Sequence, residues 1–309
     1  MHKDRRFRAR APGRSWLLVG LILTGSAALF ACAPDPTPTP LPPSATPPLT
    51  ATPSPAPAAS ATPTIAPSPT ADCLAQPGRI VNAVLDTALL PKPMTYHVYL
   101  PPCYDADQAR RYPVLYMLHG QGDNEDQWLR LGVPSAADKL IASAAIPPLI
   151  IVFPYDYSYL QPTQYRFEDA FIGVLIPQID LAYRSLPDAA HRAVGGLSRG
   201  GAWALHLGIH HPDLFGAIGA DSPAIFYSDS GSLRLYLRDI PAERLPRLYI
   251  DVGDADSELE TDLGFKAFLD GYNIPYEWHE YIGFHDEAYW GAHVEEYLRW
   301  YAQGWQSAP

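Results

Sequence analysis

The sequence predicts an α/β fold in which a mostly parallel central sheet is covered by helices on both faces. From residue 79 onward, short apolar runs alternate with stretches of helical periodicity, as they do in chains built from βαβ units. Several of these runs, such as 112–120 and 148–154, are almost continuously apolar, which is typical of strands buried on both faces of a parallel sheet. The part of the chain that follows residue 71 has the size of one α/β domain.

The elements follow one another in a regular order. We expect a helix at 135–146 with Ser135 as its N-cap, and a helix at 167–185 that kinks or breaks at Pro177. Strands are expected at 79–85, 95–102, 112–120, 148–154, 191–196, 214–222, 247–254 and 275–283. Further helices are expected at 199–212, 258–272 and 295–305, with a helix-like stretch between the strands at 214–222 and 247–254.

The first 31 residues have the pattern of a secretory signal peptide. A start rich in Lys and Arg is followed by the apolar run "WLLVGLILTGSAALFA", which is shorter than the roughly 20 residues of a membrane-spanning helix. The run ends at Cys32, and "LFAC" resembles a bacterial lipobox, in which the cysteine is lipidated and becomes the new N-terminus. The alternative is an uncleaved membrane anchor. We therefore expect an extracytoplasmic protein held at the cell surface by a lipid on Cys32.

Residues 32–71 consist almost entirely of Pro, Thr, Ala and Ser. Such a segment has too few apolar side chains to offset the entropy of ordering and stays an extended spacer. We interpret it as a disordered tether between the lipid and a folded domain at 72–309.

Charge and cysteine content narrow the classes of partner and site. The net charge of −11, with a basic N-terminus, makes the folded domain acidic, which argues against nucleic acid and against a polybasic membrane patch. Cys73 and Cys103 form an even pair in an oxidising compartment and predict a disulfide, although two buried thiols are the alternative. No Cys or His spacing typical of a metal site occurs, so we expect none.

The stretch "AVGGLSRGGAWAL" places a serine between a strand and a helix. Gly196, Ser198 and Gly200 form a G-x-S-x-G motif, in which the serine sits on a sharp, strained turn with its Oγ raised above the sheet edge. Side chains two residues before and after the serine would collide across that turn, so both positions require glycine. The pattern predicts that Ser198 is a nucleophile.

A nucleophilic serine needs a base and a group that orients the base. Where this motif occurs, the acid and then the histidine follow the serine along the chain. Asp251, Asp254 and Asp256 lie at the end of a predicted strand, and His285 lies in a loop at the same edge of the sheet. Asp251 is committed to one face of its strand, which leaves Asp256 and Asp254 as candidates. The other histidines considered, at positions 206, 210, 211, 279 and 293, are interpreted as structural or surface residues.

An oxyanion hole requires two backbone N–H groups. One is expected from Arg199, the residue after the nucleophile, and the other from Gln121 in the loop "LHGQGDNEDQW". His119 is interpreted as a structural residue that braces this loop.

Four stretches together resemble the "putative esterase" family of α/β-hydrolases. These are "YHVYLPPCYD", "YPVLYMLHGQGDNEDQW", "GGLSRGG" and "GFHDEAYW", and the likeness covers nearly all of residues 80–300. The family includes feruloyl esterases, S-formylglutathione hydrolases, enterochelin esterases and mycolyltransferases. Its nucleophile falls on Ser198, its histidine on His285 and its acid, in a G-x-x-D turn, on Asp256. Many members have Met where this chain has Arg199, which leaves the backbone donor intact.

The resemblance implies an α/β-hydrolase fold and acyl-ester chemistry without a cofactor. A serine esterase acting on small-molecule or carbohydrate-linked esters is the first hypothesis, and an acyltransferase with the same triad is the second. A catalytically silent binding protein is the third, and the intact Ser–Asp–His order argues against it.

The site is expected to be open. The interval 221–246 has room for a helix and loops but not for a lid domain. Aromatic residues on loops at the catalytic edge are expected to form a flat wall for a sugar or phenolic ring: Trp128, Tyr155, Tyr157, Tyr159 and Trp290.

Overall fold

The computed structural model describes residues 73–305. The predicted signal peptide, the proposed lipidation site at Cys32 and the tether at 32–71 lie outside the described residues. Within residues 73–305, no helix combines the length and the apolar character that a membrane crossing would need.

The core of the fold is an eight-stranded sheet with the order β1-β2-β4-β3-β5-β6-β7-β8. β1 pairs with β2 and β2 with β4 in antiparallel fashion, and all other neighbours are parallel. The predicted α/β-hydrolase fold with a mostly parallel sheet is therefore confirmed. The strands are β1 (Arg79–Leu85), β2 (Met94–Leu100), β3 (Val114–Leu118), β4 (Ile150–Pro154), β5 (Arg192–Leu197), β6 (Ala217–Asp221), β7 (Arg247–Gly253) and β8 (Glu277–Tyr281).

Burial explains the sequence patterns of the strands. Every residue of β3, β4, β5 and β6 is buried, because these strands lie inside the sheet with helices over both faces. In β1, at the edge of the sheet, exposed residues and less exposed ones alternate.

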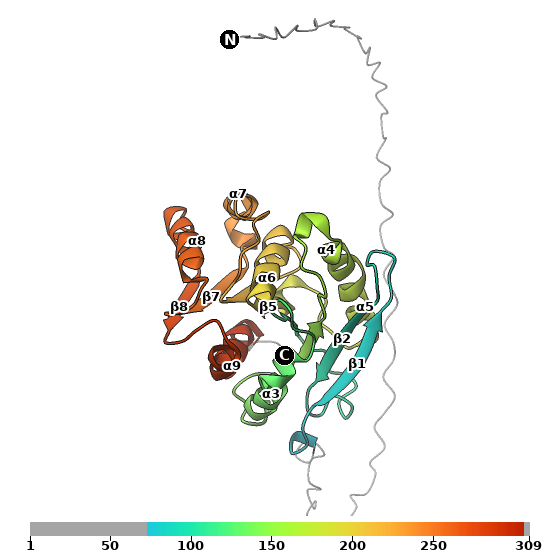
Figure 1. Ribbon diagram of the computed structural model, residues 1–309. Helices are drawn as coiled ribbons and strands as arrows, with labels where there is room; N and C mark the ends of the chain where they lie inside the picture. Colours follow the sequence, from blue (N-terminus) through green and yellow to red (C-terminus); the bar gives the residue numbers. More distant parts are fainter. Residues whose placement is uncertain (1–72, 306–309) are drawn as a thin grey trace, which may run out of the picture. The chain divides into compact units, whose positions relative to one another are not determined.

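Helices cover the two faces of the sheet as separate groups (Figure 1). α3 and α9 pack against each other on one face, while α4, α5, α6, α7 and α8 lie on the other. The helices are α2 (Gln127–Arg130), α3 (Val133–Ala142), α4 (Phe167–Ala170), α5 (Ile176–Ala182), α6 (Arg199–His210), α7 (Ser232–Asp239), α8 (Leu259–Gly271) and α9 (Glu287–Ala302). Short helical turns are η1 (Pro162–Gln164), η2 (Phe171–Leu175), η3 (Ala189–His191), η4 (Ala242–Arg244) and η5 (Gln303–Trp305).

Two helix details bear on the sequence expectation, and the first corrects it while the second agrees with it. α3 begins at Val133 after the left-handed Gly132 (φ 89°), so Ser135 lies inside the helix and is not its N-cap. The expected break at Pro177 takes the form of a π-helical turn, η2, between α4 and α5. Proline has no N–H to donate to the preceding turn, and the wider turn accommodates that loss.

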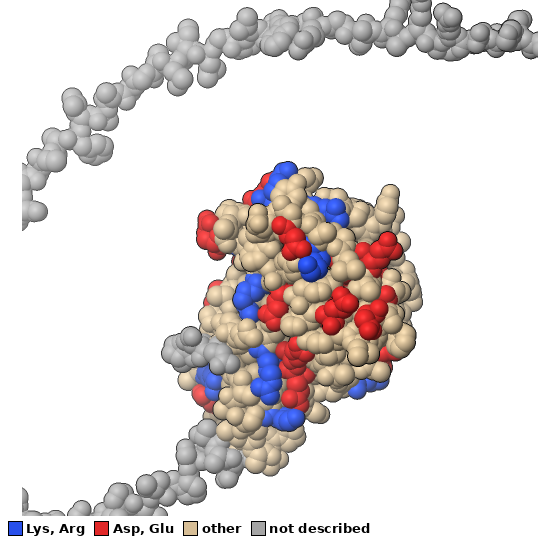
Figure 2. Space-filling view, turned by 90° about the vertical axis from the view of Figure 1, so that its left-hand side faces the viewer, with Lys and Arg blue, Asp and Glu red and all other residues tan. Residues whose placement is uncertain are grey.

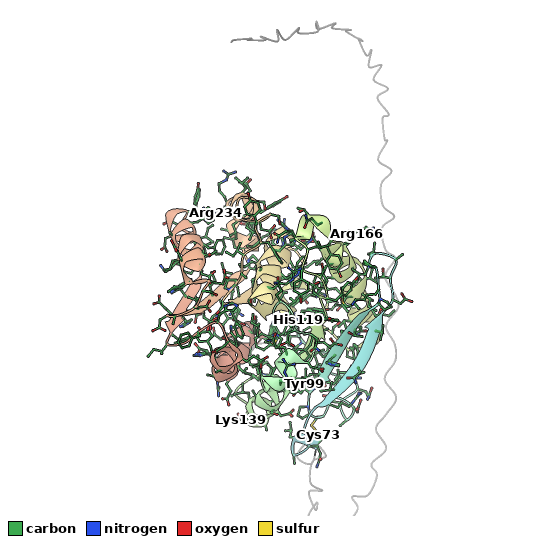
Figure 3. All side chains as sticks on the ribbon, in the orientation of Figure 1. Cys73, Tyr99, His119, Lys139, Arg166 and Arg234 are labelled. Atoms are coloured by element: carbon green, nitrogen blue, oxygen red, sulfur yellow. A yellow bond between two sulfur atoms is a disulfide. The ribbon has the colours of Figure 1, made fainter. Side chains whose placement is uncertain are left out.

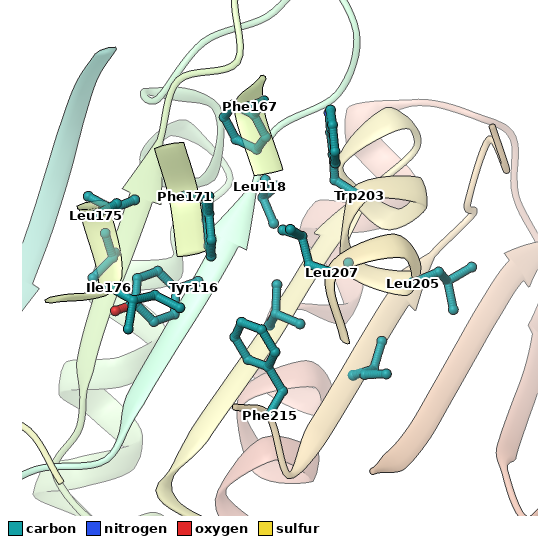
Figure 4. Packing of buried hydrophobic residues seen from close by; sticks show 14 of the residues in the cluster. Tyr116, Leu118, Phe167, Phe171, Leu175, Ile176, Trp203, Leu205, Leu207 and Phe215 are labelled. Atoms are coloured by element: carbon teal, nitrogen blue, oxygen red, sulfur yellow. The ribbon is translucent and has the colours of Figure 1, made fainter. Parts of the chain in front are cut away.

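Large aromatic side chains join α4 and α6 over the sheet (Figure 4). The Phe167 ring lies 4.8 Å from the Trp203 ring and 5.7 Å from the Phe171 ring, measured between centroids. Figure 4 shows Leu118, at the end of β3, between Phe171 and Trp203. The packing holds α4 and η2 against α6, the helix that follows Ser198.

The predicted disulfide between Cys73 and Cys103 is present, with the two Cα atoms 5.0 Å apart. Figure 3 shows Cys73 at the end of the domain where the described chain starts. The bond closes a loop of 30 residues that contains β1 and β2. It therefore anchors the start of the chain to the antiparallel edge of the sheet.

Charges of both signs are interspersed over the face that Figure 2 shows. Lys266 pairs with Asp270 on α8 at 3.0 Å, and Arg238 with Asp239 on α7 at 2.8 Å. Exposed pairs of this kind contribute little to stability, because water and salt screen the two charges. The fold therefore depends on its core, not on these surface pairs.

Asp262 is a carboxylic acid buried inside α8. Its side chain is 1% exposed, and neither carboxyl oxygen has a hydrogen-bond partner within residues 73–305. Burial raises the pKa of Asp262 to about 9, so the group is protonated in the folded state at neutral pH. In the unfolded chain, the Asp262 carboxyl ionises at about pH 3.9.

We predict that Asp262→Asn stabilises the fold increasingly as pH rises. Below about pH 4, Asp262 is protonated in the folded and the unfolded chain alike, so its full contribution to the free energy of unfolding is present. As pH rises toward the folded pKa of about 9, Asp262 ionises in the unfolded chain first, and this contribution is lost. Asn cannot ionise, so it removes this loss. Denaturant unfolding at pH 4, 6 and 8 measures the effect, with the exposed Asp213→Asn as the control. A difference from wild type that is equal at all three pH values contradicts the prediction.

Candidate active site

Ser198 occupies a strained turn between β5 and α6. Its φ of 53° and ψ of −120° lie outside the regions that L-residues prefer. A Cβ at position 196 would lie 2.5 Å from the backbone of Gly200, and one at position 200 would lie 2.2 Å from the carbonyl oxygen of Leu118. Both positions must therefore be glycine, as the sequence motif predicts.

His285 lies in the loop between β8 and α9 and joins two groups. Its Nε2 is 2.8 Å from the Ser198 Oγ. Its Nδ1 is 2.9 Å from one Asp256 oxygen and 3.0 Å from the other. Because a carboxylate only accepts, Nδ1 carries a proton and donates it to Asp256, which leaves Nε2 free to accept from the serine hydroxyl. The structure thus brings Ser198, His285 and Asp256 together.

The three acidic candidates separate clearly. Burial raises the pKa of Asp256, but hydrogen bonds from His285, the Glu258 N–H and the Ser222 side chain outweigh it and hold the pKa below its usual value. Asp254 turns away and accepts from the Gly283 N–H at 3.0 Å. Asp251 is buried in β7 and accepts from the Tyr297 hydroxyl at 2.8 Å.

Two buried side chains, Ser222 and Trp290, support the pair of Asp256 and His285. Ser222, directly after β6, is fully buried with φ 48° and hydrogen-bonds to Asp256. The Trp290 Nε1 donates to the Ser222 Oγ at 3.3 Å, and the Trp290 ring meets the His285 ring edge-on at 5.0 Å. Trp290 is only 4% exposed, so its ring supports His285. The prediction that Trp290 forms part of a substrate wall is therefore wrong.

The loop after β3 approaches Ser198 from the opposite side. Gln121 and Arg199 both line the pocket at Ser198. The Arg199 N–H belongs to the first turn of α6, where backbone donors have no partner within the helix. The Gly120 N–H donates to the Gln127 Oε1 at 2.8 Å, which fixes the loop next to Gln121. Sequence reasoning did not single out Gln127.

His119, labelled in the middle of the domain in Figure 3, braces this loop, as the sequence suggested. Its Nε2 accepts from the Asp156 N–H at 2.9 Å, and its Nδ1 donates to the Gly120 carbonyl at 2.7 Å. Burial lowers the pKa of His119, so the ring is neutral, which this pair of hydrogen bonds requires. The ring therefore ties the loop after β3 to the loop after β4.

Arg199 contributes a buried side chain as well as a backbone donor. Its Nε donates to Asp156 at 2.9 Å, and Trp203 Nε1 donates to the same carboxylate oxygen at 2.8 Å. Its Nη2 donates to the Leu160 carbonyl at 2.8 Å. Asp156 thereby joins the start of α6 to the loop after β4.

A pocket of about 250 Å³ opens at Ser198. One part of its wall is apolar and aromatic, and the other is polar. It is lined by Gln121, Gln161, Ser198, Arg199, Ala224, Ile225, Phe226, Tyr227 and Glu258. The segment between β6 and β7 holds α7 and η4, in agreement with the prediction that no lid domain is inserted there.

The predicted aromatic wall is wrong for Trp128 as well as for Trp290. Trp128 is 1% exposed and donates to the Leu118 carbonyl, because α2 turns its ring into the core. Tyr155, Tyr157 and Tyr159 line a separate pocket of about 60 Å³ next to Gly122.

The aromatic residues at the Ser198 pocket come from another loop. They are Phe226 and Tyr227, which follow β6. Sequence reasoning missed them. The signal available was their place after a strand whose carboxyl end lies at the same edge as Ser198.

This arrangement has the parts needed for acyl transfer. A serine hydroxyl contacts the Nε2 of an imidazole, and a carboxylate with a lowered pKa orients that imidazole. Backbone donors at the start of a helix and in the loop after β3 lie beside the same pocket.

Comparison with known proteins agrees with this chemistry. The family model described as "Putative esterase" matches residues 87–301. The chain is 33% identical to an endo-1,4-beta-xylanase/feruloyl esterase of Xylanibacter ruminicola over 178 residues. These residues make up 54% of this chain. The match spans 23% of the Xylanibacter protein, so the chain corresponds to about a quarter of that protein's length.

Solved structures show the same fold. A ferulic acid esterase has 27% identity and a TM-score of 0.67, covering 74% of this chain and 99% of that one. An S-formylglutathione hydrolase of Staphylococcus aureus has 16% identity and a TM-score of 0.60, covering 73% and 99% of the two chains. The second of these likenesses concerns the fold alone.

We predict that Asp256→Asn lowers kcat for ester hydrolysis by about 10⁴-fold, because an amide no longer holds His285 in the tautomer that accepts from Ser198. Asp254→Asn is the matched control, since its side chain contacts the Gly283 N–H instead of His285. Steady-state kinetics on one soluble ester measures both variants. A larger loss of kcat in Asp254→Asn overturns the assignment of the acid.

Proposed function

Because this chain belongs to the esterase family of α/β-hydrolases, we propose that it hydrolyses aryl carboxylic esters attached to carbohydrates, of the feruloyl type. The hydrogen-bonded series Ser198–His285–Asp256, with contacts of 2.8 and 2.9 Å, is the observation that carries the proposal. Hydrolysis requires only water as the second substrate and no cofactor.

In this mechanism His285 Nε2 takes the proton of the Ser198 hydroxyl as Oγ attacks the ester carbonyl carbon. The N–H groups of Arg199 and Gln121 stabilise the oxyanion of the tetrahedral intermediate. His285 returns the proton to the leaving alcohol oxygen as the C–O bond breaks, leaving an acyl-serine. Water then attacks the acyl carbon by the same steps and releases the acid.

The residues that line the pocket support a substrate in which an aryl acid is esterified to a polar alcohol such as a sugar. Ile225, Phe226 and Tyr227 offer an apolar surface beside Ser198, while Gln161 and Glu258 offer polar groups suited to sugar hydroxyls.

Exposed apolar side chains occur on the two loops that carry Tyr227 and His285. Tyr227 is 89% exposed, and Ile282 and Phe284, in the loop that carries His285, are 92% and 64% exposed. Large exposed apolar side chains beside a pocket are typical of ligand contact. They give a bulky ester a surface outside the pocket.

The relatives support the same substrate class. The Xylanibacter protein and the ferulic acid esterase with a TM-score of 0.67 both carry feruloyl or ferulic acid esterase in their names. A neighbouring xylanase activity in the Xylanibacter name agrees with a polysaccharide setting for that protein. For this chain we propose the ester activity only.

The place of action that we propose is the outer side of a bacterial membrane. The signal-like N-terminus, the lipobox-like sequence at Cys32 and the Pro/Thr/Ala/Ser-rich stretch behind it support a lipid-anchored enzyme. The tether lets the catalytic domain reach substrates that do not enter the cell.

We predict that the purified protein cleaves methyl ferulate and feruloylated or acetylated sugars faster than emulsified long-chain triglycerides, and that Ser198→Ala reduces the rate close to background. Mass spectrometry of a fluorophosphonate adduct identifies the reactive serine. Labelling at another serine overturns the role of Ser198. Preference for triglycerides overturns the substrate class, and transfer of the acyl group to an alcohol in place of water overturns hydrolysis.

Tyr227→Ala tests the apolar wall separately. We expect KM for methyl ferulate to rise several-fold while KM for an acetyl ester changes little, because only the aryl group reaches the ring. Tyr272→Ala, on an exposed tyrosine at the end of α8, is the control. Equal changes for both esters contradict the proposed wall.

Lipidation of Cys32 is tested by Cys32→Ser in the full chain. We expect the wild type in the membrane fraction and the variant released from it, because a single serine hydroxyl cannot take the lipid. Mass spectrometry of the mature N-terminus identifies the modification. Wild-type protein recovered from the medium without lipid contradicts the anchor.

A further inference from the structure

A cluster of histidines and carboxylates lies at the far end of α6 from Ser198. His206 Nε2 is 3.2 Å from the Glu168 Oε2 and 3.3 Å from the His210 Nδ1. These ligand atoms all lie within 4.8 Å of one another. His206 and His210 are one helical turn apart, and Glu168 reaches them from α4.

Two of the three distances among these atoms match a zinc coordination shell, and the third lies within 4.8 Å. With Zn–N and Zn–O bonds of about 2.0–2.1 Å, two ligands of a tetrahedral ion lie about 3.3 Å apart. The distances of 3.2 and 3.3 Å from His206 Nε2 to its two neighbours equal this edge length. Two imidazoles with one carboxylate are a donor set that suits Zn²⁺, and three protein ligands leave one position for water.

Two further side chains orient the ligands from outside. The fully buried Asp229 accepts from the His206 Nδ1 at 2.8 Å, which leaves Nε2 as the nitrogen that faces Glu168 and His210. His211 Nε2 contacts the other Glu168 oxygen at 2.8 Å. A carboxylate behind a ligating histidine is the usual outer partner of a zinc site.

The charges agree with a divalent cation. Glu168 and the buried Asp229 together carry two negative charges when ionised, and His206 and His210 are neutral when their nitrogens bind metal. Without metal, His206 faces a carboxylate with each ring nitrogen and balances the pair as a cation, so a Zn²⁺ ion would take the place of the Nε2 proton between the same carboxylates.

We propose that Glu168, His206 and His210 bind one Zn²⁺ ion, with Asp229 and His211 as outer partners. The expectation that the chain has no metal site rested on spacing along the sequence. The third ligand, Glu168, is 38 residues from His206 and is brought there only by the packing of α4 against α6.

The site connects elements that shape the active-site pocket. Asp229 follows Phe226 and Tyr227 in the loop after β6, and its N–H donates to the Phe226 carbonyl at 2.9 Å. Figure 3 shows Arg166, the residue before α4, and Arg234, on α7, at the same end of the molecule. A bound ion would therefore hold α4, α6 and this loop together, and we expect it to raise Tm.

The test titrates the full chain, freed of metal with a chelator, with Zn²⁺ alone by calorimetry. We expect one strong site, a higher Tm with Zn²⁺, and reversal by the chelator. His210→Ala and Glu168→Gln each remove one ligand while Asp229 keeps its contact with His206. Each should weaken binding by more than the roughly 10- to 100-fold that loss of an outer partner costs. His191→Ala, at a partly exposed histidine paired with Asp188, should bind as wild type does.

Co²⁺ provides an independent readout. Substitution by Co²⁺ should give the strong visible absorption of a tetrahedral ion in wild type and in His191→Ala, and not in His210→Ala. Absence of one-to-one binding in the wild type overturns the proposal. Binding of unchanged strength in both His210→Ala and Glu168→Gln also overturns it, because the ion then lies elsewhere. Neither outcome bears on Ser198 or on ester hydrolysis.

Discussion

The active site depends on how closely α6 approaches the end of β3. A Cβ on Gly200 would lie 2.2 Å from the Leu118 carbonyl oxygen and 2.7 Å from that of His119. Only glycine permits this approach, and the approach forces Ser198 into its turn with φ 53°. Strain of this kind persists only where the surroundings hold it. Here the Ser198 N–H donates to the Asp221 carbonyl at 2.8 Å, and the Ala224 N–H donates to the Ser198 carbonyl at 3.1 Å.

Buried polar groups transmit this constraint to the neighbouring loops. Asp156 accepts from Arg199 and Trp203 of α6, while its own N–H donates to His119. Removal of one partner would leave a buried charge or donor without compensation, which is why such groups occur as connected sets. The loop that carries Gln121, the loop after β4 and the start of α6 are therefore positioned as one unit.

The pair of His285 and Asp256 is positioned by different means. The Glu258 N–H donates to Asp256 at 2.8 Å, and Trp290 packs against the His285 ring while contacting Ser222. These partners come from α8, α9 and the loop after β6, so the base is held by elements on both faces of the sheet. The pocket wall of Phe226 and Tyr227 begins four residues after Ser222 in that same loop.

The sequence by itself determined the order and chemistry of this protein. Alternating apolar runs were enough for the parallel sheet, and the crowded turn makes Gly196, Ser198 and Gly200 recognisable because local backbone sterics demand those residues. The family resemblance favoured Asp256 over Asp254 as the acid, and the structure places Asp256 against His285. Tertiary structure alone decided which aromatic rings reach the pocket. Trp128 and Trp290 are buried because helix orientation turns their rings inward. The meeting of Glu168 with His206 likewise depends on how α4 packs against α6. Such contacts depend on the direction of side chains on packed elements, which spacing along the chain does not encode.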